Sequence, residues 1–320
     1  MDHQFINQFK ENDTVTSVFQ VTDKLFRSNK NGNFYIQLIL SDRTGSIDAR
    51  VWNAREELFS SFECNDFVLC EGIIQRFQGN LQFVVRRLYK ADESEFSRED
   101  FTRATQIDVP AMLRRITELL HEIKTPCLYN LADCYLTDDD YMAKFCQSPA
   151  GIKLHHAYRG GLLEHTKTMM EIVSRIVPLY GDLLNGDLLM IATFLHDSGK
   201  ICELACDDHF SYTDAGQLLG HSLMALEILD GKIREAETLA GEPFDPQMAM
   251  LLKHLIVSHH GLPVNGSTKL PMTLEAMTLH LIDSLDAKLA EFHKYIVEDP
   301  NSASTWTNYI PGLERKLYKG

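Results

Sequence analysis

The sequence predicts a two-domain protein, a small antiparallel β-barrel followed by an all-helical domain. Apolar residues alternate with period two over about residues 14–90, and they recur at helical spacing from residue 111 onward. The stretch between these regions is polar, charged and without periodicity. We therefore expect a barrel domain at residues 1–95, a linker at 96–110 and a helical domain at 111–320.

The first region contains two predicted β-hairpins. From Phe34 to Trp52, apolar residues alternate along two strands, with Phe34 first in the inward row, and SDRTGS makes the turn between them. The second hairpin turns at QGN, where Gly79 can adopt a positive φ. About five short antiparallel strands in so few residues favour a closed barrel, because closure removes exposed strand edges.

The second region carries helix-spaced apolar residues separated by breakers such as GG, NGD and HGLPVNGS. The expected helices are residues 111–123, 161–179, 187–197, 214–229, 246–259 and 273–294.

Histidines and aspartates gather at the ends of these helices or inside them. A buried carboxylate such as Asp283 needs a partner, and imidazole with carboxylate is a ligand set that suits Mn, Fe, Co or Zn. In FLHDSGK, His196 and Asp197 diverge by about 100° on a helix, yet a short carboxylate can bridge two ions while the imidazole holds one. The pattern indicates a centre with two metal ions.

Composition and charge exclude several classes of protein. The formal charge of −14 is uneven, since residues 24–90 hold ten Lys and Arg against seven Asp and Glu, whereas residues 96–320 hold 20 against 31. A mildly basic module thus precedes an acidic one. The seven cysteines include no CxxC pair, which argues against a disulfide framework or a zinc ribbon. With no membrane span or signal peptide recognisable, we expect a cytoplasmic protein.

The order of His165, His196-Asp197 and Asp283 resembles the pattern of the HD-domain metal-dependent phosphohydrolases, an all-helical superfamily, and HDSGK resembles its central motif. The phrases HHAYRGGLLEHT, LLGHSL, SHHG and LHLIDSLDAK resemble one branch of that superfamily, the YhaM-type 3′-to-5′ exoribonucleases. In that branch an OB-fold barrel precedes the HD domain. The resemblance covers nearly the whole chain.

The resemblance implies roles for individual residues. One ion would be held by His165, His196, Asp197 and Asp283, and the other by Asp197, His221 and His259. His260 would either complete the second site or touch substrate. Manganese is the expected metal, with Mg, Co, Fe or Zn as other candidates. Asp197 and Lys200 are the expected catalytic residues; the residues expected to bind substrate are Lys200, His155, His156 and Arg159. Asp286 is expected to support the site or lie on the helix surface.

Two divalent ions can activate a bridging water and hold both oxygens of an in-line displacement, so no protein nucleophile is needed. The sequence has no GxxxxGK[ST] loop, which argues against nucleotide-driven chemistry. OB-fold barrels bind single strands with positive and aromatic side chains. The residues expected to do so here are Tyr35, Arg50, Trp52, Arg76, Phe77 and Arg86. A place in the barrel core is an equal alternative for Tyr35 and Phe77.

The leading hypothesis is a metal-dependent 3′-to-5′ exonuclease on single-stranded RNA that releases nucleoside 5′-monophosphates, with DNA left open as a second substrate. The alternative enzyme is a phosphohydrolase of small nucleotides whose barrel serves as an assembly surface. A third hypothesis is a nucleic-acid-binding regulator without catalysis. No membrane partner is expected, and a homo-oligomer is left open.

Overall fold

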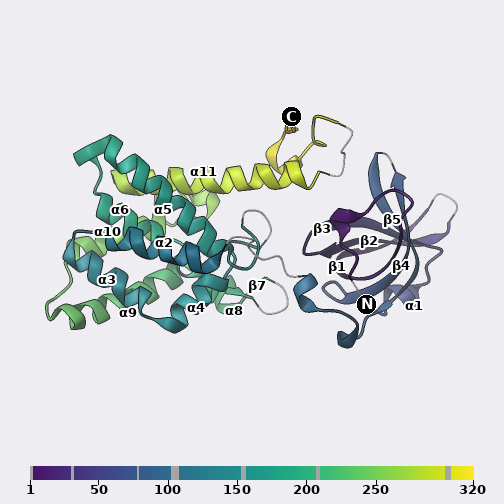
Figure 1. The fold of residues 1–320 in the computed structure, drawn as a ribbon, viewed down its shortest axis with the longest axis horizontal. Helices are drawn as coiled ribbons and strands as arrows, with labels where there is room; N and C mark the ends of the chain where they lie inside the picture. Colours follow the sequence, from purple (N-terminus) through teal and green to yellow (C-terminus); the bar gives the residue numbers. More distant parts are fainter. Residues whose placement is uncertain are drawn as a thin grey trace. The chain divides into compact units, whose positions relative to one another are not determined.

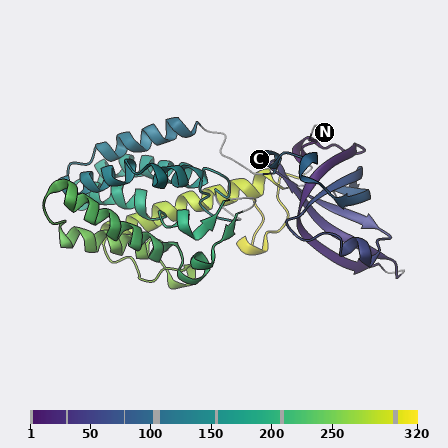
Figure 2. The same cartoon turned by 90° about the horizontal axis from the view of Figure 1, so that it is seen from below.

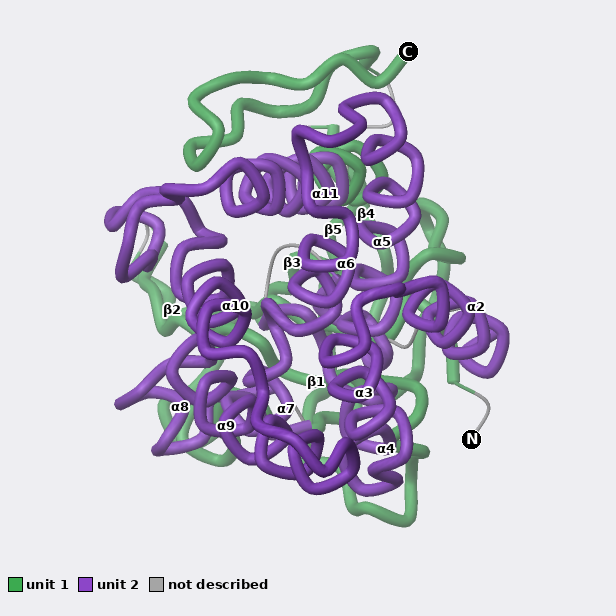
Figure 3. Tube along the Cα trace, turned by 90° about the vertical axis from the view of Figure 1, so that its left-hand side faces the viewer, with its two compact units in different colours: residues 1–103, 292–320 green, residues 104–291 purple. Residues whose placement is uncertain are grey.

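A computed structural model describes residues 3–29, 32–77, 79–101, 108–152, 156–206, 210–299 and 304–320. The chain divides into two compact units, residues 1–103 with 292–320 and residues 104–291 (Figures 1 and 3). The domain boundaries expected after residues 95 and 110 stay a prediction, because a division by contacts does not test which segments fold alone.

The N-terminal unit contains a closed five-stranded barrel. Its strands are β1 (Thr14–Ser28), β2 (Phe34–Asp42), β3 (Gly45–Trp52), β4 (Phe67–Phe77) and β5 (Asn80–Lys90), with α1 (Glu56–Phe59) between β3 and β4. The strands join in the order β1-β2-β3-β5-β4, and β4 pairs with β1. The predicted barrel is confirmed, but β3 and β5 run parallel. The long connection through α1 and β4 provides the crossover that a parallel pair needs.

The alternating apolar residues fill the barrel as predicted, and its twisted strands are seen in Figure 2. The buried rows comprise Ile36, Leu38 and Leu40 on β2, Ile47, Ala49 and Val51 on β3, and Phe83 and Val85 on β5. Phe34 is an exception, since it is half-exposed and stacks on Phe26 with 5.1 Å between the ring centroids. β4 has a bulge at Gly72, where its backbone lies close to β5. A Cβ on Gly72 would approach the carbonyl oxygen of Val84 to 2.1 Å, so this position requires glycine.

Part of the predicted linker lies against the barrel. The rings of Phe96 and Phe101 contact Phe67, with centroid distances of 4.4 and 4.9 Å. Residues 102–107 lie outside the described part of the chain. The first helix of the second unit is then capped by Asp108, whose carboxylate accepts a hydrogen bond from the backbone N–H of Ala111.

The second unit is a helical bundle, as predicted. Its helices are α2 (Val109–His121), α3 (Pro126–Leu136), α4 (Asp139–Gln147), α5 (Gly161–Tyr180), α6 (Gly186–Leu195), α7 (Lys200–Glu203), α8 (Asp214–Leu219), α9 (His221–Ala240), α10 (Pro246–Ser258) and α11 (Leu274–Val297). A two-stranded sheet, β6 (Leu204–Ala205) with β7 (Ser211–Tyr212), lies between α7 and α8. The sequence did not predict α3, α4 or α7. The helix predicted at 214–229 is divided by Gly220, whose φ is 76°.

The centre of the bundle positions the candidate site. Every residue from Leu188 to Leu195 of α6 is buried, so this helix has no polar face. It ends at Leu195, two residues earlier than predicted, and His196 and Asp197 follow in the turn. Because α6 is buried along its length, the side chains of His196 and Asp197, which directly follow it, lie in the core of the bundle. In the part of the chain that the structure describes, no helix could span a membrane.

After α11 the chain folds back on itself. Ile310, Leu313 and Leu317 form a small core with residues of the last turns of α11. The 3-10 helix η6 (Pro311–Leu313) lies within this segment.

Candidate metal centre

Five segments that are far apart in the sequence supply the side chains of the site. His165 comes from α5, His196 and Asp197 follow α6, and His221 is the first residue of α9. The remaining contributions are His259 and His260, directly after α10, and Asp283 and Asp286 on α11. All seven predicted ligands therefore lie in or beside one site.

Asp197 is the central residue. Its Oδ2 lies 3.4 Å from Nε2 of His196 and 3.8 Å from Nε2 of His165. Its Oδ1 lies 3.5 Å from Nε2 of His221 and 3.6 Å from Nε2 of His259. Each carboxylate oxygen thus faces a different pair of imidazoles, the arrangement of a carboxylate that can bridge two cations.

Asp283 adds a second carboxylate on the His165 side of Asp197. Its Oδ1 lies 3.4 Å from Nε2 of His165. Burial tends to raise the pKa of Asp283, but its hydrogen bond with His165 and the nearby imidazoles outweigh burial and lower it. The side chain is therefore ionised, as a metal ligand must be.

Two of the imidazoles are oriented by backbone carbonyl groups. The Nδ1–H of His196 donates to the carbonyl oxygen of Thr193 at 2.8 Å, and that of His259 donates to the carbonyl of Ile256 at 2.6 Å. A carbonyl oxygen only accepts, so Nδ1 carries the hydrogen and Nε2 carries the lone pair. In both residues the lone pair is directed toward Asp197.

The other two imidazoles are oriented by carboxylates. The Nδ1–H of His165 donates to Oδ2 of Asp286 at 2.6 Å, and that of His221 donates to Oε1 of Glu203 at 3.1 Å. Such outer carboxylates fix the tautomer and raise the basicity of a metal-binding imidazole. All four histidines therefore turn Nε2 toward the central carboxylate.

Several polar atoms of the site are buried without a hydrogen bond. They are Nε2 of His196, Nε2 of His259 and Oδ1 of Asp197. Leaving such atoms without a partner costs free energy, whereas a divalent cation between imidazole nitrogen and carboxylate oxygen would satisfy them. The residues present thus fit metal ions.

Lys200 contacts the central carboxylate directly. Its Nζ lies 2.6 Å from Oδ2 of Asp197 and 2.6 Å from the carbonyl oxygen of Ala150. Burial alone would raise the pKa of Asp197, but the charge of Lys200 and the imidazole of His196 outweigh it and hold that pKa well below its usual range. Lys200 is itself buried, and it is the first residue of α7.

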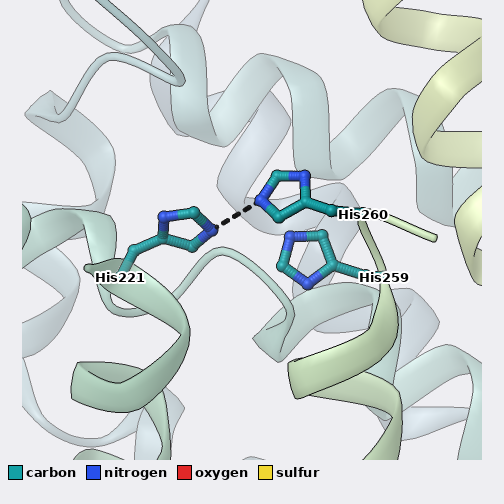
Figure 4. Close-up of side chains that lie close together, drawn as sticks. All are labelled: His221, His259 and His260. Carbon is teal, nitrogen blue, oxygen red and sulfur yellow. Dashed lines mark hydrogen bonds between the residues drawn. The ribbon is translucent and has the colours of Figure 1, made fainter. Parts of the chain in front are cut away.

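His260 lies beside the second pair of imidazoles, as Figure 4 shows. Its Nε2 is 3.0 Å from Nε2 of His221, and its ring centroid is 4.0 Å from that of His259. Since Nδ1 of His221 carries the hydrogen of that ring, His260 is the donor in this contact. Burial, together with the neighbouring imidazoles of His259 and His221, lowers the pKa of His260 to about 3, so the ring is neutral near pH 7.

The predicted substrate residues occupy different surroundings. The Nε2–H of His156 donates to Asp286 at 2.8 Å, which links His156 to the carboxylate that orients His165. Arg159 donates from Nη2 to the carbonyl oxygen of Cys206 at 3.3 Å. His155 lies outside the described residues.

Sequence reasoning missed Glu203. Its buried Oε1 accepts from the backbone N–H of His221 at 3.0 Å as well as from the ring. The sequence offers only a weak signal for it, a single acidic residue in KICELAC. Gly199 is part of the same contact, because a Cβ there would come within 2.0 Å of the carbonyl oxygen of His221.

The barrel residues predicted to contact a nucleic acid fall mainly into two groups. Tyr35 and Trp52 are paired across β2 and β3, with 5.0 Å between ring centroids, and Trp52 is half-exposed. Arg50 shares that face and lies 3.3 Å from Asp48.

The second group lies at the hairpin of β4 and β5. Arg76 donates to the carbonyl oxygen of Gly79 at 2.9 Å and lies 3.2 Å from Glu11. Phe77 is an exposed neighbour, and Arg86 is exposed farther along β5. Neither Tyr35 nor Phe77 is in the buried core of the barrel.

Two known domain families match the two units. Residues 17–91 match the OB-fold nucleic acid binding domain, and residues 162–288 match the HD domain. The class of protein is therefore an OB-fold domain followed by an HD domain. HD domains are metal-dependent, and the described residues include His and Asp groups that could hold metal ions.

Curated relatives extend the match along the chain. The 3′-5′ exoribonuclease YhaM of Geobacillus sp. (strain WCH70) is 35% identical over 90% of this chain and 86% of the relative. YhaM of Bacillus velezensis is 35% identical over 90% of this chain and 89% of the relative, and YhaM of Bacillus subtilis is 34% identical over 81% and 80%. The chain belongs to the YhaM family of 3′-5′ exoribonucleases.

Among solved structures, a domain of replication protein A from Methanococcus maripaludis covers 29% of this chain and 98% of its own, with 23% identity and a TM-score of 0.25.

Proposed function

We propose that this protein is a metal-dependent 3′-5′ exoribonuclease that hydrolyses single-stranded RNA to nucleoside 5′-monophosphates. The observation that supports this most directly is the central carboxylate of Asp197, which turns one oxygen toward each of two histidine pairs. The relatives over 90% of the chain carry the name 3′-5′ exoribonuclease YhaM. The same family match disfavours a phosphohydrolase of small nucleotides.

The residues would hold two divalent ions, of which manganese is our expectation. One ion is assigned to His165, His196, Asp197 and Asp283, and the other to Asp197, His221 and His259. When bound, such ions activate water and neutralise the charge that develops on a phosphoryl group. His260 is placed to join the second set or to contact the substrate.

The chain's own residues prepare this site in three ways. Lys200 keeps Asp197 ionised and holds its Oδ2 in place. Asp286 and Glu203 fix the imidazoles of His165 and His221 with Nε2 inward. The buried surroundings exclude bulk water, which strengthens each of these interactions.

In the barrel, Trp52 and Tyr35 provide a platform on which bases can stack, and Arg50 adds positive charge beside them. Arg76, Phe77 and Arg86 are proposed to extend this surface. We place RNA ahead of DNA as the substrate, and a cytoplasmic location stays a prediction.

The test is a time course with Mn²⁺ on a single-stranded RNA labelled at its 5′ end. We expect a ladder that shortens from the 3′ end, and we expect Asp197→Ala to abolish it. Asp182→Ala, which changes an exposed aspartate of η4 (Gly181–Leu183), is the matched control and should leave the ladder unchanged. Intact RNA together with turnover of mononucleotides would instead support the small-nucleotide alternative.

A further inference from the structure

One face of α11 is apolar and exposed along four turns. Leu274, Met277, Leu281, Leu285 and Leu289 are between 45 and 62% exposed. Their spacing of three and four residues places them in a row on one side of the helix. We call these five residues the outer stripe. In Figure 1, α11 forms the upper edge of the helical unit.

The outer stripe has no part in the core or in the metal centre. Successive residues of a helix turn by about 100°, so Asp283 lies about half a turn from Leu274. The inward side of α11 also buries Ala276 and Leu279 in the core of the bundle. A single exposed leucine is ordinary in a folded protein, but a continuous row of five marks an interaction surface.

The size of this surface suits a stable protein partner. Leu270 and Met272, which directly precede α11, are exposed as well. A leucine or methionine side chain carries roughly 100 Å² of apolar surface when fully exposed, so these seven half-exposed side chains offer about 400 Å². A standard interface buries about 800 Å² per partner, of which somewhat more than half is apolar.

We propose that the outer stripe binds the outer stripe of a second copy of this chain, with the two α11 helices antiparallel about a two-fold axis that crosses the stripe at the level of residue 283. In this register Leu281 meets Leu285 of the partner subunit, and Met277 meets Leu289 of the partner subunit. These four side chains then face one another, as a two-fold interface requires of a surface that binds itself.

The charges along the stripe favour this direction over a parallel one. Lys288 is exposed on the same side of α11 as the stripe, where it pairs with Glu291 of its own helix at 2.7 Å. In the antiparallel pair it lies opposite Thr278 of the partner subunit. A parallel pair would instead place the two Lys288 side chains against each other, and like charges across an interface are unfavourable. The antiparallel pair also sets opposite ends of the helix dipoles side by side.

Sedimentation of the full chain at micromolar concentration tests the proposal. We expect the native protein to sediment with twice the chain mass of 36.5 kDa. Leu281→Glu and Leu285→Lys should each give monomers, because each places two unpaired charges in the interface. An equimolar mixture of the two variants should form dimers again. The mixed dimer has one Glu–Lys pair and one Leu–Leu pair, whereas a dimer of either variant alone would have two contacts between a charged side chain and a leucine.

Leu179→Glu is the matched control, since Leu179 is an 80% exposed leucine on α5 outside the stripe, and it should leave the dimer intact. Circular dichroism and thermal unfolding verify that every variant is folded. A native monomer, a dimer that neither substitution affects, or a mixture that stays monomeric would overturn the proposal. Sedimentation does not measure the hydrolysis of RNA, so the dimer and the proposed activity are tested independently.

Discussion

Glu203 and His221 are joined twice. The same carboxylate oxygen of Glu203 accepts from the backbone N–H of His221 at 3.0 Å and from its ring Nδ1–H at 3.1 Å. Glu203 therefore fixes both the first residue of α9 and the direction of its imidazole. The Nε2 of His221 is left facing Oδ1 of Asp197 at 3.5 Å.

Replacing Glu203 should weaken one metal site and spare the other. We expect Glu203→Ala to lower the affinity of the site that includes His221 by about 10- to 100-fold, because the ring loses the group that fixes its tautomer. Glu203→Gln should lower this affinity less, since its amide oxygen can still accept a hydrogen bond from His221. Calorimetric titration of the metal-free protein with Mn²⁺ measures both. Equal weakening of every binding step by Glu203→Ala would contradict a role confined to His221.

Asp286 should act on the opposite half of the centre. It accepts from His165 at 2.6 Å and from His156 at 2.8 Å, whereas Glu203 accepts from His221. Asp286→Asn is expected to weaken the binding step left unchanged by Glu203→Ala, again by about 10- to 100-fold. The same titration provides the measurement. If both substitutions affected the same step, the division of ligands into two sets would be wrong.

The predictable part of the fold rests on local periodicity. Alternation along β2, β3 and β5 gave the barrel, and helical spacing gave α2, α5, α6, α10 and α11. The parallel pairing of β3 with β5 was missed, because it depends on a crossover that no local pattern encodes. α3 was missed because the apolar residues of PCLYNLADCYL are not confined to its buried face, which weakens the helical period.

The site divides in the same way. The candidate ligands could be selected because the order of their motifs resembles a known family, and the structure brings them together around Asp197. The partner of His221 could not be selected, because Glu203 reaches it only through the tertiary contact between α7 and α9. Lys200 was expected to face a phosphate, yet in the structure it pairs with Asp197. Pairing of buried charges is a property of the folded core and leaves no spacing in the sequence.

Trp52 should contribute to affinity for a single strand more than to turnover. Stacking of a base on an aromatic ring is worth about 1–3 kcal/mol, so Trp52→Ala should weaken RNA binding by about 5- to 150-fold. Fluorescence anisotropy measures this best in the Asp197→Ala background, where the strand should stay intact. Tyr89→Ala, which changes a similarly exposed aromatic residue of β5, is the control. Unchanged affinity for Trp52→Ala would remove this ring from the binding surface.

Asp42 should make the stability of the barrel depend on acid. Its buried carboxylate, at the turn between β2 and β3, accepts from the backbone N–H groups of Ile6 and Thr44 at 2.7 and 2.6 Å. Burial tends to raise the pKa of Asp42, but hydrogen bonds from His3, Thr44 and Ile6 outweigh it and lower the pKa below its usual 3.8. The ionised form therefore stabilises the folded barrel.

A lowered folded-state pKa contributes stability above the unfolded pKa, and this contribution is lost as the pH falls through the folded value. We expect Asp42→Asn to reduce the free energy of unfolding by about 1–3 kcal/mol near pH 7. The difference from the native protein should shrink below about pH 4, where Asp42 also becomes neutral. Urea unfolding can be followed by Trp52 fluorescence in a Trp306→Phe background, because the chain has two tryptophans. A difference that stayed constant down to about pH 2, below the usual carboxyl pKa, would show that the charge of Asp42 contributes nothing and that the substituted amide merely packs less well in the turn.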